Sequence, residues 1–545
     1  SSTQGEFNMP GMIVAPQPLA VEEGAKVLAA GGNAFDAALT AAAVQGMIDP
    51  HSCGLGGYLV MTCHPADATG PHAVIDAPAV AGSRVTPDMW QDVVLGANPR
   101  GWGFFLKGKV NDNGYQSVCT PGMVRGMTAI HERWGTRSWA EMLAPAIRVA
   151  NEGFVVNDHL ASRWKDPAQL PEASSLYEKL NVTPDAQRIW LKPGGKTYEA
   201  GETIRNPDYG RSLERLVKHG PQDFYTGELA GEMIADLTKH DGWVTADDLA
   251  GYRHREEAPV VASYRDYTIV TNQPPHGGPT LAAILQILEG YDVASYEHNS
   301  AEYIWLVSMA MKGAFADRNR HLADPDFEKV PLEWMISKDR AARWRDVIDK
   351  GEPIVPGLLH QDTPDTTHVT VVDRWGNAVS LTHSLGMSSG AITPGLGFMY
   401  NNSMINFHPF PGHPNSIAPK KGRTTGMTPT IVRKGNKPVL VIGAPGATRI
   451  ITSILQVIVN VLDFKMSVSD AVLSPRFDCQ GDTIFAQMRI PQMVLDEVAQ
   501  KHAVTRMPQS HGGMALVHAI TIDEQTGALN GAADAGADGM SLLVH

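Results

Sequence analysis

The sequence changes character at one point, and that point limits how the chain can fold. Residues 351–365 are polar, contain three prolines and show no hydrophobic periodicity, which is typical of an exposed linker. Directly after the linker, residues 366–382 alternate as two strands about a turn at 373–377. Any fold of this chain therefore has to place a strand that begins at Thr366 beside an exposed, stiff segment.

Length and charge narrow the class of protein. The 545 residues are enough for one large domain or several ordinary ones. The net charge of −13 is mild for this length and argues against a protein that tracks nucleic-acid phosphates. No apolar run approaches the ~20 residues that span a bilayer, and residues 1–8 show no export signal. We expect a cytoplasmic protein without a nucleic-acid or membrane partner; a signal removed earlier is left open.

Metal and cofactor motifs are missing from the sequence. The four cysteines contain no C-x-x-C pair and the histidines no H-E-x-x-H motif, so a zinc site has no support and buried thiols are expected. The glycines at 54–57 are not followed by the Lys-Ser/Thr of a phosphate-binding loop. We expect neither a metal nor a cofactor.

The order of the predicted elements indicates the fold class. Hydrophobic periodicity predicts helices at 37–45, 139–151, 213–218, 228–240, 280–288 and 447–461. Strands are predicted at 58–62, 366–372, 378–382 and 437–442. Strands followed by helices, without regular alternation, suggest a layered α+β sandwich.

A threonine at the start of a strand gains a special chemistry if the chain is cut before it. A threonine hydroxyl is a poor nucleophile without a base beside it, and a new α-amine, with a pKa near ~8, supplies that base. The Thr366 hydroxyl can produce this amine itself by attacking the Asp365 carbonyl, which gives an ester that water opens. Residues 365 and 366 are therefore the predicted cleavage site and Thr366 the predicted nucleophile.

Ordered motifs across nearly the whole chain, from about residue 11 to 543, resemble the γ-glutamyltransferase family of N-terminal-nucleophile hydrolases. The motifs lie at residues 31–38, 120–122, 223–227, 274–278, 316–318, 366–373, 376–379, 427–431 and 443–450. The resemblance implies an αββα sandwich made of a large subunit, 1–365, and a small subunit, 366–545, cut from one precursor. It also implies that the two subunits stay together as a heterodimer; pairing into a heterotetramer is left open.

The same resemblance implies roles for single residues. Thr366 would carry an acyl group that water or an amine removes. Ser384 matches the hydroxyl residue that hydrogen-bonds the nucleophile's amine. Gly446 and Ala447 match the pair whose backbone N–H groups form the oxyanion hole, and a strand-to-helix turn suits that task because its amides are unpaired.

The residues that bind a γ-glutamyl group in the family are largely replaced in this sequence. The arginine placed before an Ala-Pro step is absent at Asp76-Ala77-Pro78, the family asparagine is Gly386, and the family aspartate is Asn406. The serine pair has become Thr425-Gly426. Losing an arginine and a carboxylate together removes charge-assisted recognition. We therefore predict a small-molecule amide or acyl substrate without an ordinary γ-glutamyl head.

Several polar residues remain candidates for substrate binding. They are Gly386, Ser403, Asn406, Arg423, Thr425 and Gly426, with Ser388, Ser389, Asn401 and Asn402 as further candidates for the pocket. The alternative within the family is a true γ-glutamyl hydrolase or transpeptidase with rearranged contacts.

Two alternatives come from other classes. Residues 386–390 match G-x-S-x-G, which would make Ser388 the nucleophile of an α/β-hydrolase, but residues 391–395 do not suit the helix that must follow. A catalytically dead scaffold is the other alternative, although Thr366, Thr367, Ser384 and Gly446 are all present.

Overall fold

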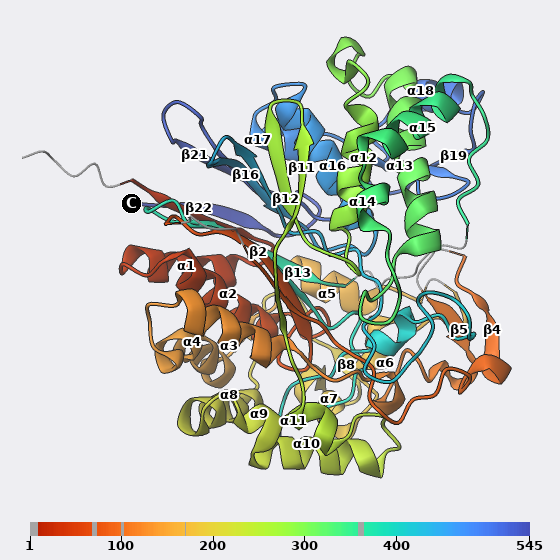
Figure 1. Ribbon diagram of the computed structural model, residues 1–545. Helices are drawn as coiled ribbons and strands as arrows, with labels where there is room; N and C mark the ends of the chain where they lie inside the picture. Colours follow the sequence, from red (N-terminus) through yellow and green to blue (C-terminus); the bar gives the residue numbers. More distant parts are fainter. Residues whose placement is uncertain (1–8, 68–72, 100–102, 169, 358–364) are drawn as a thin grey trace, which may run out of the picture.

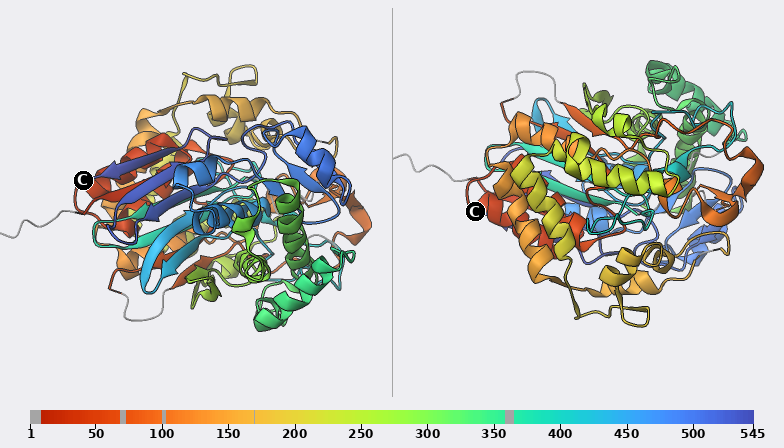
Figure 2. Two further views of the ribbon diagram at one scale, coloured as in Figure 1. Left: turned by 90° about the horizontal axis from the view of Figure 1, so that it is seen from above. Right: turned by 90° about the horizontal axis from the view of Figure 1, so that it is seen from below.

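Two β-sheets packed face to face form the centre of the molecule (Figure 1). The computed structural model describes residues 9–67, 73–99, 103–168, 170–357 and 365–545. Helices cover the outer face of each sheet (Figure 2). This arrangement confirms the predicted α+β sandwich of αββα layers.

The first sheet mixes strands from both sides of residue 365. In sheet order its members are β10 (Arg255–Glu257), β3 (Val74–Ala77), β2 (Tyr58–His64), β14 (Ala378–Ser384), β13 (Thr367–Val372), β1 (Gly11–Ala15) and β22 (Met540–Val544). The central pairs are antiparallel, with Thr367 opposite His383 and Ser384 opposite Tyr58. The hairpin β13–β14 predicted from the sequence is therefore the middle of this sheet.

The second sheet is built mainly from the C-terminal part of the chain. In sheet order its members are β11 (Val260–Tyr264), β12 (Tyr267–Thr271), β15 (Thr430–Lys434), β16 (Lys437–Gly443), β20 (His518–Ile522) and β21 (Leu529–Ala533). Apolar side chains from both sheets meet between them, among them Val14, Val372, Val441 and Ile520. Their burial joins the two sheets through the hydrophobic effect.

The outer helices bury their apolar faces on the two sheets. The helices on the first sheet's side are α1 (Pro18–Ala29), α2 (Ala34–Ile48), α3 (Met123–Trp134), α4 (Trp139–Glu152) and α8 (Pro207–His219). Those on the second sheet's side are α12 (Gly278–Leu288), α13 (Ala301–His321), α16 (Arg449–Leu462) and α17 (Val468–Leu473). Helix α2 is buried along its whole length, and Asn33 and Asp36 close its first turn as a capping box.

Further elements surround this sandwich. The helices are α5 (Asp158–Lys165), α6 (Leu176–Lys179), α7 (Pro184–Trp190), α9 (Asp223–Thr226), α10 (Glu228–Lys239), α11 (Ala246–Ala250), α14 (Leu332–Met335), α15 (Lys338–Asp349) and α18 (Gln492–Val498). The strands are β4 (Val94–Ala97), β5 (Phe104–Leu106), β6 (Phe154–Val155), β7 (Leu191–Lys192), β8 (Lys196–Thr197), β9 (Thr203–Ile204), β17 (Phe477–Asp478), β18 (Ile484–Ala486) and β19 (Val504–Arg506). In the described ranges, no helix has the length and apolarity that crossing a membrane requires.

Most predicted elements are confirmed, and their boundaries move for local reasons. The helix predicted at 213–218 begins at Pro207, because Asn206 caps it by accepting a hydrogen bond from the Tyr209 amide. The helix predicted from 447 begins at Arg449, because Ala447 has a φ of 60° and cannot be helical. The four cysteines are buried free thiols, as expected.

Candidate active site

Thr366 lies immediately before β13, against the carbonyl group that it is predicted to attack. Its hydroxyl is 2.6 Å from the Asp365 carbonyl oxygen and 2.9 Å from the Ser384 hydroxyl. These three groups come together because antiparallel pairing places the end of β14 opposite the start of β13. The structure therefore brings the predicted nucleophile, its cleavage site and its hydroxyl partner into contact.

Ser384 is held in a fixed orientation by its neighbours. Its hydroxyl accepts a hydrogen bond from the Gly386 amide at 2.8 Å and donates one to the Asp365 carbonyl oxygen at 2.9 Å. The side chain is buried. A donor on this oxygen polarises the Asp365 carbonyl, which is the group that must accept the nucleophile.

A buried glutamine of helix α2 is hydrogen-bonded to both β13 and β14. Gln45 donates from Nε2 to the His368 carbonyl oxygen at 3.0 Å, and its Oε1 accepts from His383 Nε2 at 2.7 Å. Burial lowers the pKa of His383 to about 3, so the ring is neutral and its tautomer is set by this bond. The support fixes the start of β13 and therefore the position of Thr366.

The predicted oxyanion turn lies between β16 and α16. Gly446 has a φ of 134° and Ala447 a φ of 60°, so both residues lie outside the helical region. Within the described part of the chain, neither amide N–H donates a hydrogen bond. A Cβ on Gly446 would lie 2.6 Å from the Ala515 Cα, and one on Gly426 would lie 2.1 Å from the Ala447 carbonyl oxygen. Close backbone packing thus holds the turn.

Thr366 and this turn open onto one cavity of about 320 Å³. Asp365, Thr366, Gly446 and Ala447 all lie in its lining. An open backbone amide pair beside a hydroxyl nucleophile is the arrangement that acyl transfer requires. These four residues are the part of the predicted site that the cavity brings together.

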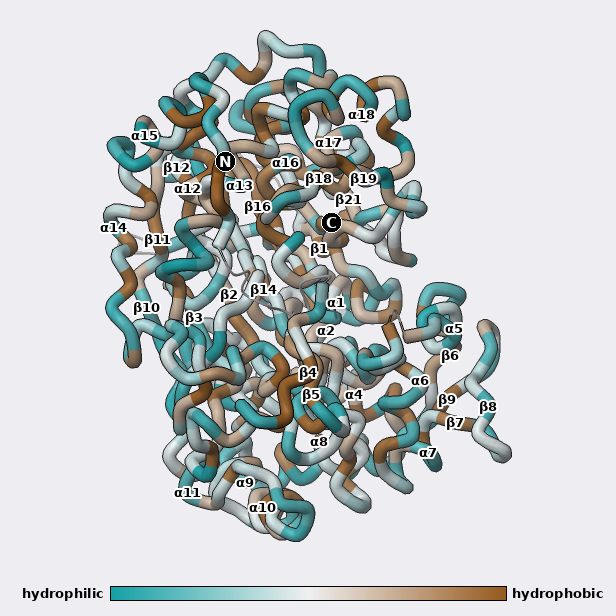
Figure 3. The backbone as a smooth tube through the Cα atoms, turned by 90° about the vertical axis from the view of Figure 1, so that its right-hand side faces the viewer, coloured by the Kyte–Doolittle hydropathy of each residue, from teal (hydrophilic) through white to brown (hydrophobic). Residues whose placement is uncertain are grey.

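Part of the apolar wall of the cavity comes from β5, the second strand of the hairpin β4–β5. Phe104, Phe105 and Leu106 of β5 line it, with Met387 and Ile405. Figure 3 shows hydrophobic colouring along this hairpin. The wall favours an acyl group with an apolar portion, because burial of apolar surface stabilises a bound ligand.

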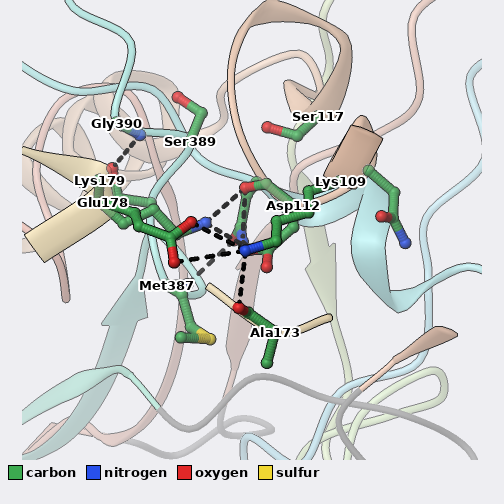
Figure 4. Close-up of polar contacts among 12 residues, drawn as sticks. Lys109, Asp112, Ser117, Ala173, Glu178, Lys179, Met387, Ser389 and Gly390 are labelled. Atoms are coloured by element: carbon green, nitrogen blue, oxygen red, sulfur yellow. Dashed lines mark hydrogen bonds and ion pairs between the residues drawn. The ribbon is translucent and has the colours of Figure 1, made fainter. Parts of the chain in front are cut away.

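Charged groups on the wall near β5 are paired with one another. Lys109 donates to the Ala173 carbonyl oxygen at 2.9 Å and forms an ion pair with Glu178 at 3.0 Å. Behind it, the fully buried Lys179 pairs with Asp112 (Figure 4). This part of the wall is therefore electrically balanced.

The six predicted substrate-binding residues lie elsewhere. Of the described residues that line the cavity, none is Gly386, Ser403, Asn406, Arg423, Thr425 or Gly426. All six are buried. That they contact a substrate stays a prediction, but the structure does not bring them to the cavity.

Local packing accounts for two of these residues. Arg423 stacks on the ring of Tyr58, with 4.3 Å between the guanidinium carbon and the ring centroid, which is a cation–π contact. Thr425 lies 2.6 Å from Nδ1 of His276, and the other ring nitrogen lies 2.8 Å from Asp76. Both side chains have protein partners where they lie.

The alternative nucleophile Ser388 lies in a buried turn. Its φ is 69°, and its hydroxyl accepts a hydrogen bond from the Gly390 amide at 2.9 Å. No helix follows it before residue 403. The strand-to-helix turn that an α/β-hydrolase nucleophile requires is absent from this described segment.

The cavity also contains residues that were not predicted for it. Arg163 and His159 of α5 line it, although residues 366 and 163 are far apart in the chain, and in the sequence both look like ordinary surface residues of a capped helix. Arg449 of α16 lines it as well; this residue lies in the 443–450 motif, but the motif indicates no role for its side chain. Only the fold places them near Thr366.

Comparisons with known proteins identify the family of the chain. The sequence profile of the family described as Gamma-glutamyltranspeptidase matches residues 20–544. The chain is 36% identical over 541 residues to the Acylase ACY 1 proenzyme of Pseudomonas sp. (strain V22), covering 98% of this chain and 93% of that protein. It is 33% identical over 489 residues to the Glutathione hydrolase proenzyme of Escherichia coli (strain K12), covering 86% and 81%.

A solved structure shows the same fold. The crystal structure of cephalosporin acylase from Bacillus halodurans superposes with a TM-score of 0.85 at 26% identity, covering 98% of this chain and 96% of that one. The family match spans nearly the whole chain, and both sequence relatives exceed 30% identity. The chain therefore belongs to the gamma-glutamyltranspeptidase family of N-terminal-nucleophile hydrolases, enzymes that act on amide bonds.

Proposed function

We propose that the chain cuts itself between Asp365 and Thr366 and then hydrolyses an amide through an acyl-enzyme on Thr366. The observation that carries this proposal is the contact of the Thr366 hydroxyl with both the Asp365 carbonyl and Ser384, at the wall of a cavity. A nucleophile, a polarised carbonyl and an open site are the parts that the reaction needs.

Self-cleavage begins from the geometry of the uncut chain. The Thr366 oxygen attacks the Asp365 carbonyl carbon, the C–N bond breaks, and the nitrogen becomes the α-amine of Thr366. The ester between Asp365 and the Thr366 oxygen is then opened by water. Ser384 donates to the carbonyl oxygen, so it stabilises the negative charge that develops there.

Turnover repeats the same chemistry on an external amide. The new α-amine of Thr366 takes the proton of the Thr366 hydroxyl, and the hydroxyl oxygen attacks the carbonyl carbon of the substrate. The amides of Gly446 and Ala447 stabilise the oxyanion, and the leaving amine takes the proton from the α-amine. Water, or a second amine, then removes the acyl group from Thr366.

The sheet topology supports a heterodimer that survives the cut. In the first sheet, β14 and β13 of the small subunit lie between β2 and β1 of the large one. In the second sheet, β12 of the large subunit pairs with β15 of the small one. Separating the subunits would break both ladders and expose the core between the sheets, so residues 1–365 and 366–545 stay together.

For the substrate, we favour an acyl group other than γ-glutamyl. Relatives carry the names acylase and glutathione hydrolase, so names alone do not choose between the two activities. The choice rests on Gly386 and Asn406, which replace the asparagine and the aspartate implied by the resemblance, and on the apolar cavity wall. Without the aspartate that the resemblance implies, the α-ammonium group of a γ-glutamyl head would leave water without that counter-charge, which costs roughly several kcal/mol.

Intact mass and a donor panel test this proposal. The purified protein is expected to give two fragments, the smaller beginning Thr-Thr-His-Val, that elute together on gel filtration. Processed enzyme is then assayed with simple acyl p-nitroanilides and γ-glutamyl-p-nitroanilide, with and without an amine acceptor. A small fragment with a different first residue would refute the nucleophile. Fastest turnover of the γ-glutamyl donor would favour the true γ-glutamyl hydrolase instead.

A further inference from the structure

An arginine in the cavity is paired with the residue that precedes the cut. Arg163 of helix α5 forms an ion pair with the Asp365 side chain. The carboxylate is almost fully buried, with 4% of the side chain exposed, and the arginine is 23% exposed. Both residues line the cavity that contains Thr366. The last residue of the large subunit therefore has its side chain in the site.

The other cations of the cavity keep their partners after cleavage. Lys109 is paired with Glu178 (Figure 4), and Arg449 pairs with Asp478 and donates to the Gly513 carbonyl oxygen at 2.6 Å. Neither partner is near the cleaved bond in sequence. Among the described Lys and Arg side chains that line the cavity, Arg163 is the one whose partner lies at the cut.

Self-cleavage and turnover both pass through an ester on the Thr366 oxygen. In the first, the ester on the Thr366 oxygen carries Asp365 as its acyl group; in the second, it carries the substrate's acyl group. Asp365 is therefore the first acyl group that the site holds. Its side chain indicates where a substituent of later acyl groups lies, and Arg163 is what it meets there.

We propose that Arg163 is a specificity-determining residue that binds a carboxylate on the acyl group of the substrate, after holding Asp365 in the precursor. This inference rests on the proposed function. In Asp365 the carboxylate carbon is three bonds from the carbonyl carbon, which matches a succinyl group. The substrate class is thus an N-succinyl-type amide, which carries a carboxylate and needs no α-ammonium group.

The reaction balances without another reactant. The Thr366 oxygen forms an ester with the succinyl carbonyl carbon while the C–N bond breaks, and the amine leaves with the proton that Thr366 gave up. Water opens the ester and releases succinate. Arg163 stays ionised throughout and binds the distal carboxylate, where a guanidinium can donate two parallel hydrogen bonds.

Asp49 and Asp166 are the charged neighbours that compete for Arg163 in the mature enzyme, and Asp166 also lines the cavity. One carboxylate oxygen of Asp49 accepts from Gln17 Nε2 at 2.9 Å, and the other is buried without a hydrogen-bond partner among the described residues. Burial lowers the pKa of Arg163, while the charges of Asp49 and Asp166 raise it. If Arg163 turned fully to Asp49 after the cut, the site would show no preference for a carboxylate.

A matched pair of donors tests the proposal on the wild-type processed enzyme. Succinyl-p-nitroanilide and butyryl-p-nitroanilide have acyl chains of the same length and differ by the terminal carboxylate. We expect kcat/KM to be about 10- to 100-fold higher for the succinyl donor, because a hydrogen bond to a charged group contributes a binding free energy equivalent to that factor. Equal rates, or a faster butyryl donor, would overturn the role of Arg163 and leave the proposed function intact. No turnover of any amide would instead refute the proposed function.

An arginine variant connects the preference to this residue. In processed Arg163→Met, the ratio of succinyl to butyryl kcat/KM is expected to fall to about 1. Arg215→Met, whose arginine pairs with Glu232 on α10, is the control and keeps the wild-type ratio. An unchanged ratio in Arg163→Met would overturn the proposal. If this variant is not processed, the wild-type donor pair alone decides.

Discussion

Two groups of polar side chains predicted for the site are held in opposite ways. Thr366 and Ser384 contact each other and the scissile carbonyl at 2.6 to 2.9 Å, and Thr366 lies in the cavity wall. Arg423 and Thr425 contact only other protein groups in the described structure and lie outside the cavity lining. The first group can reach a substrate, whereas the second has to move to do so.

The difference separates chemistry from recognition. The proposed reaction needs a fixed hydroxyl, a hydroxyl partner and two free amides. Thr366 and the turn of Gly446 and Ala447 line the cavity, and Ser384, which is outside the lining, contacts Thr366. In our proposal, recognition of the acyl group instead falls to β5 and α5, which supply Phe104, Phe105 and Arg163 to the cavity lining. A chain of this family can therefore keep its reaction while a different set of elements selects its substrate.

The largest expected effect is the loss of the nucleophile. Thr366→Ala removes the hydroxyl that attacks Asp365, so the chain should stay whole at 58.8 kDa and hydrolyse no amide. Intact mass and a donor assay measure both results. Thr366→Ser keeps a hydroxyl and is the control, which should still be processed. Cleavage of the alanine variant at the same bond would break the assignment.

The next effect concerns the hydroxyl partner. Ser384→Ala removes the donor to the Asp365 carbonyl and the contact with Thr366. Processing should slow and kcat should fall by about 100-fold or more, as loss of one preorganised donor usually produces. Single-turnover cleavage of the purified precursor measures the first step. Ser384→Thr restores the hydroxyl and should recover most of the rate; equal rates for the Ala variant and the wild type would contradict the role.

The residues predicted for the reaction come from the ends of strands that the sequence indicates. Pairing of β13 with β14 brings Thr366 and Ser384 together, whereas Gly446 and Ala447 follow β16 of the second sheet and reach the same cavity as Thr366 through the packing of the two sheets. Arg163 could not be found in this way. It lies in a short helix about 200 residues upstream by the numbering of α5 and β13, and no periodicity or spacing connects it with Thr366.

Recognition residues carried over by resemblance are harder to place. The resemblance aligns Asn406 and Gly426 with contacts of a substrate, but changed neighbours alter what the positions can do. Gly426 packs within 2.1 Å, measured from an added Cβ, of the Ala447 carbonyl oxygen, so its place is under the oxyanion turn. Positions can be inferred from motifs, whereas access to a cavity depends on packing across the whole fold.

A smaller effect should separate stability from activity in the second group. Thr425→Val removes the hydroxyl beside His276 and leaves that buried ring nitrogen unsatisfied. We expect stability to fall by about 1–3 kcal/mol, measured as a lower thermal midpoint. With Thr425 outside the cavity, kcat/KM should stay within about threefold of wild type. A large rise in KM at unchanged stability would instead place Thr425 on the substrate.

The smallest expected effect is at Ser403, and it discriminates most sharply between packing and binding. Its hydroxyl is buried and has no hydrogen-bond partner in the described part of the chain. Replacing it by hydrogen removes an unsatisfied polar group, so Ser403→Ala should leave stability unchanged or raise it by up to about 1 kcal/mol. Ser389→Ala is the matched control, because that hydroxyl donates to the Tyr400 carbonyl oxygen at 2.8 Å and accepts from the Ala391 amide at 3.0 Å. The control should lose about 1–2 kcal/mol of folding stability.

If Ser403 binds the substrate, Ser403→Ala lowers kcat/KM for the preferred donor by about tenfold or more. That result would mean that this buried region opens during turnover, and the division between the two groups would fail.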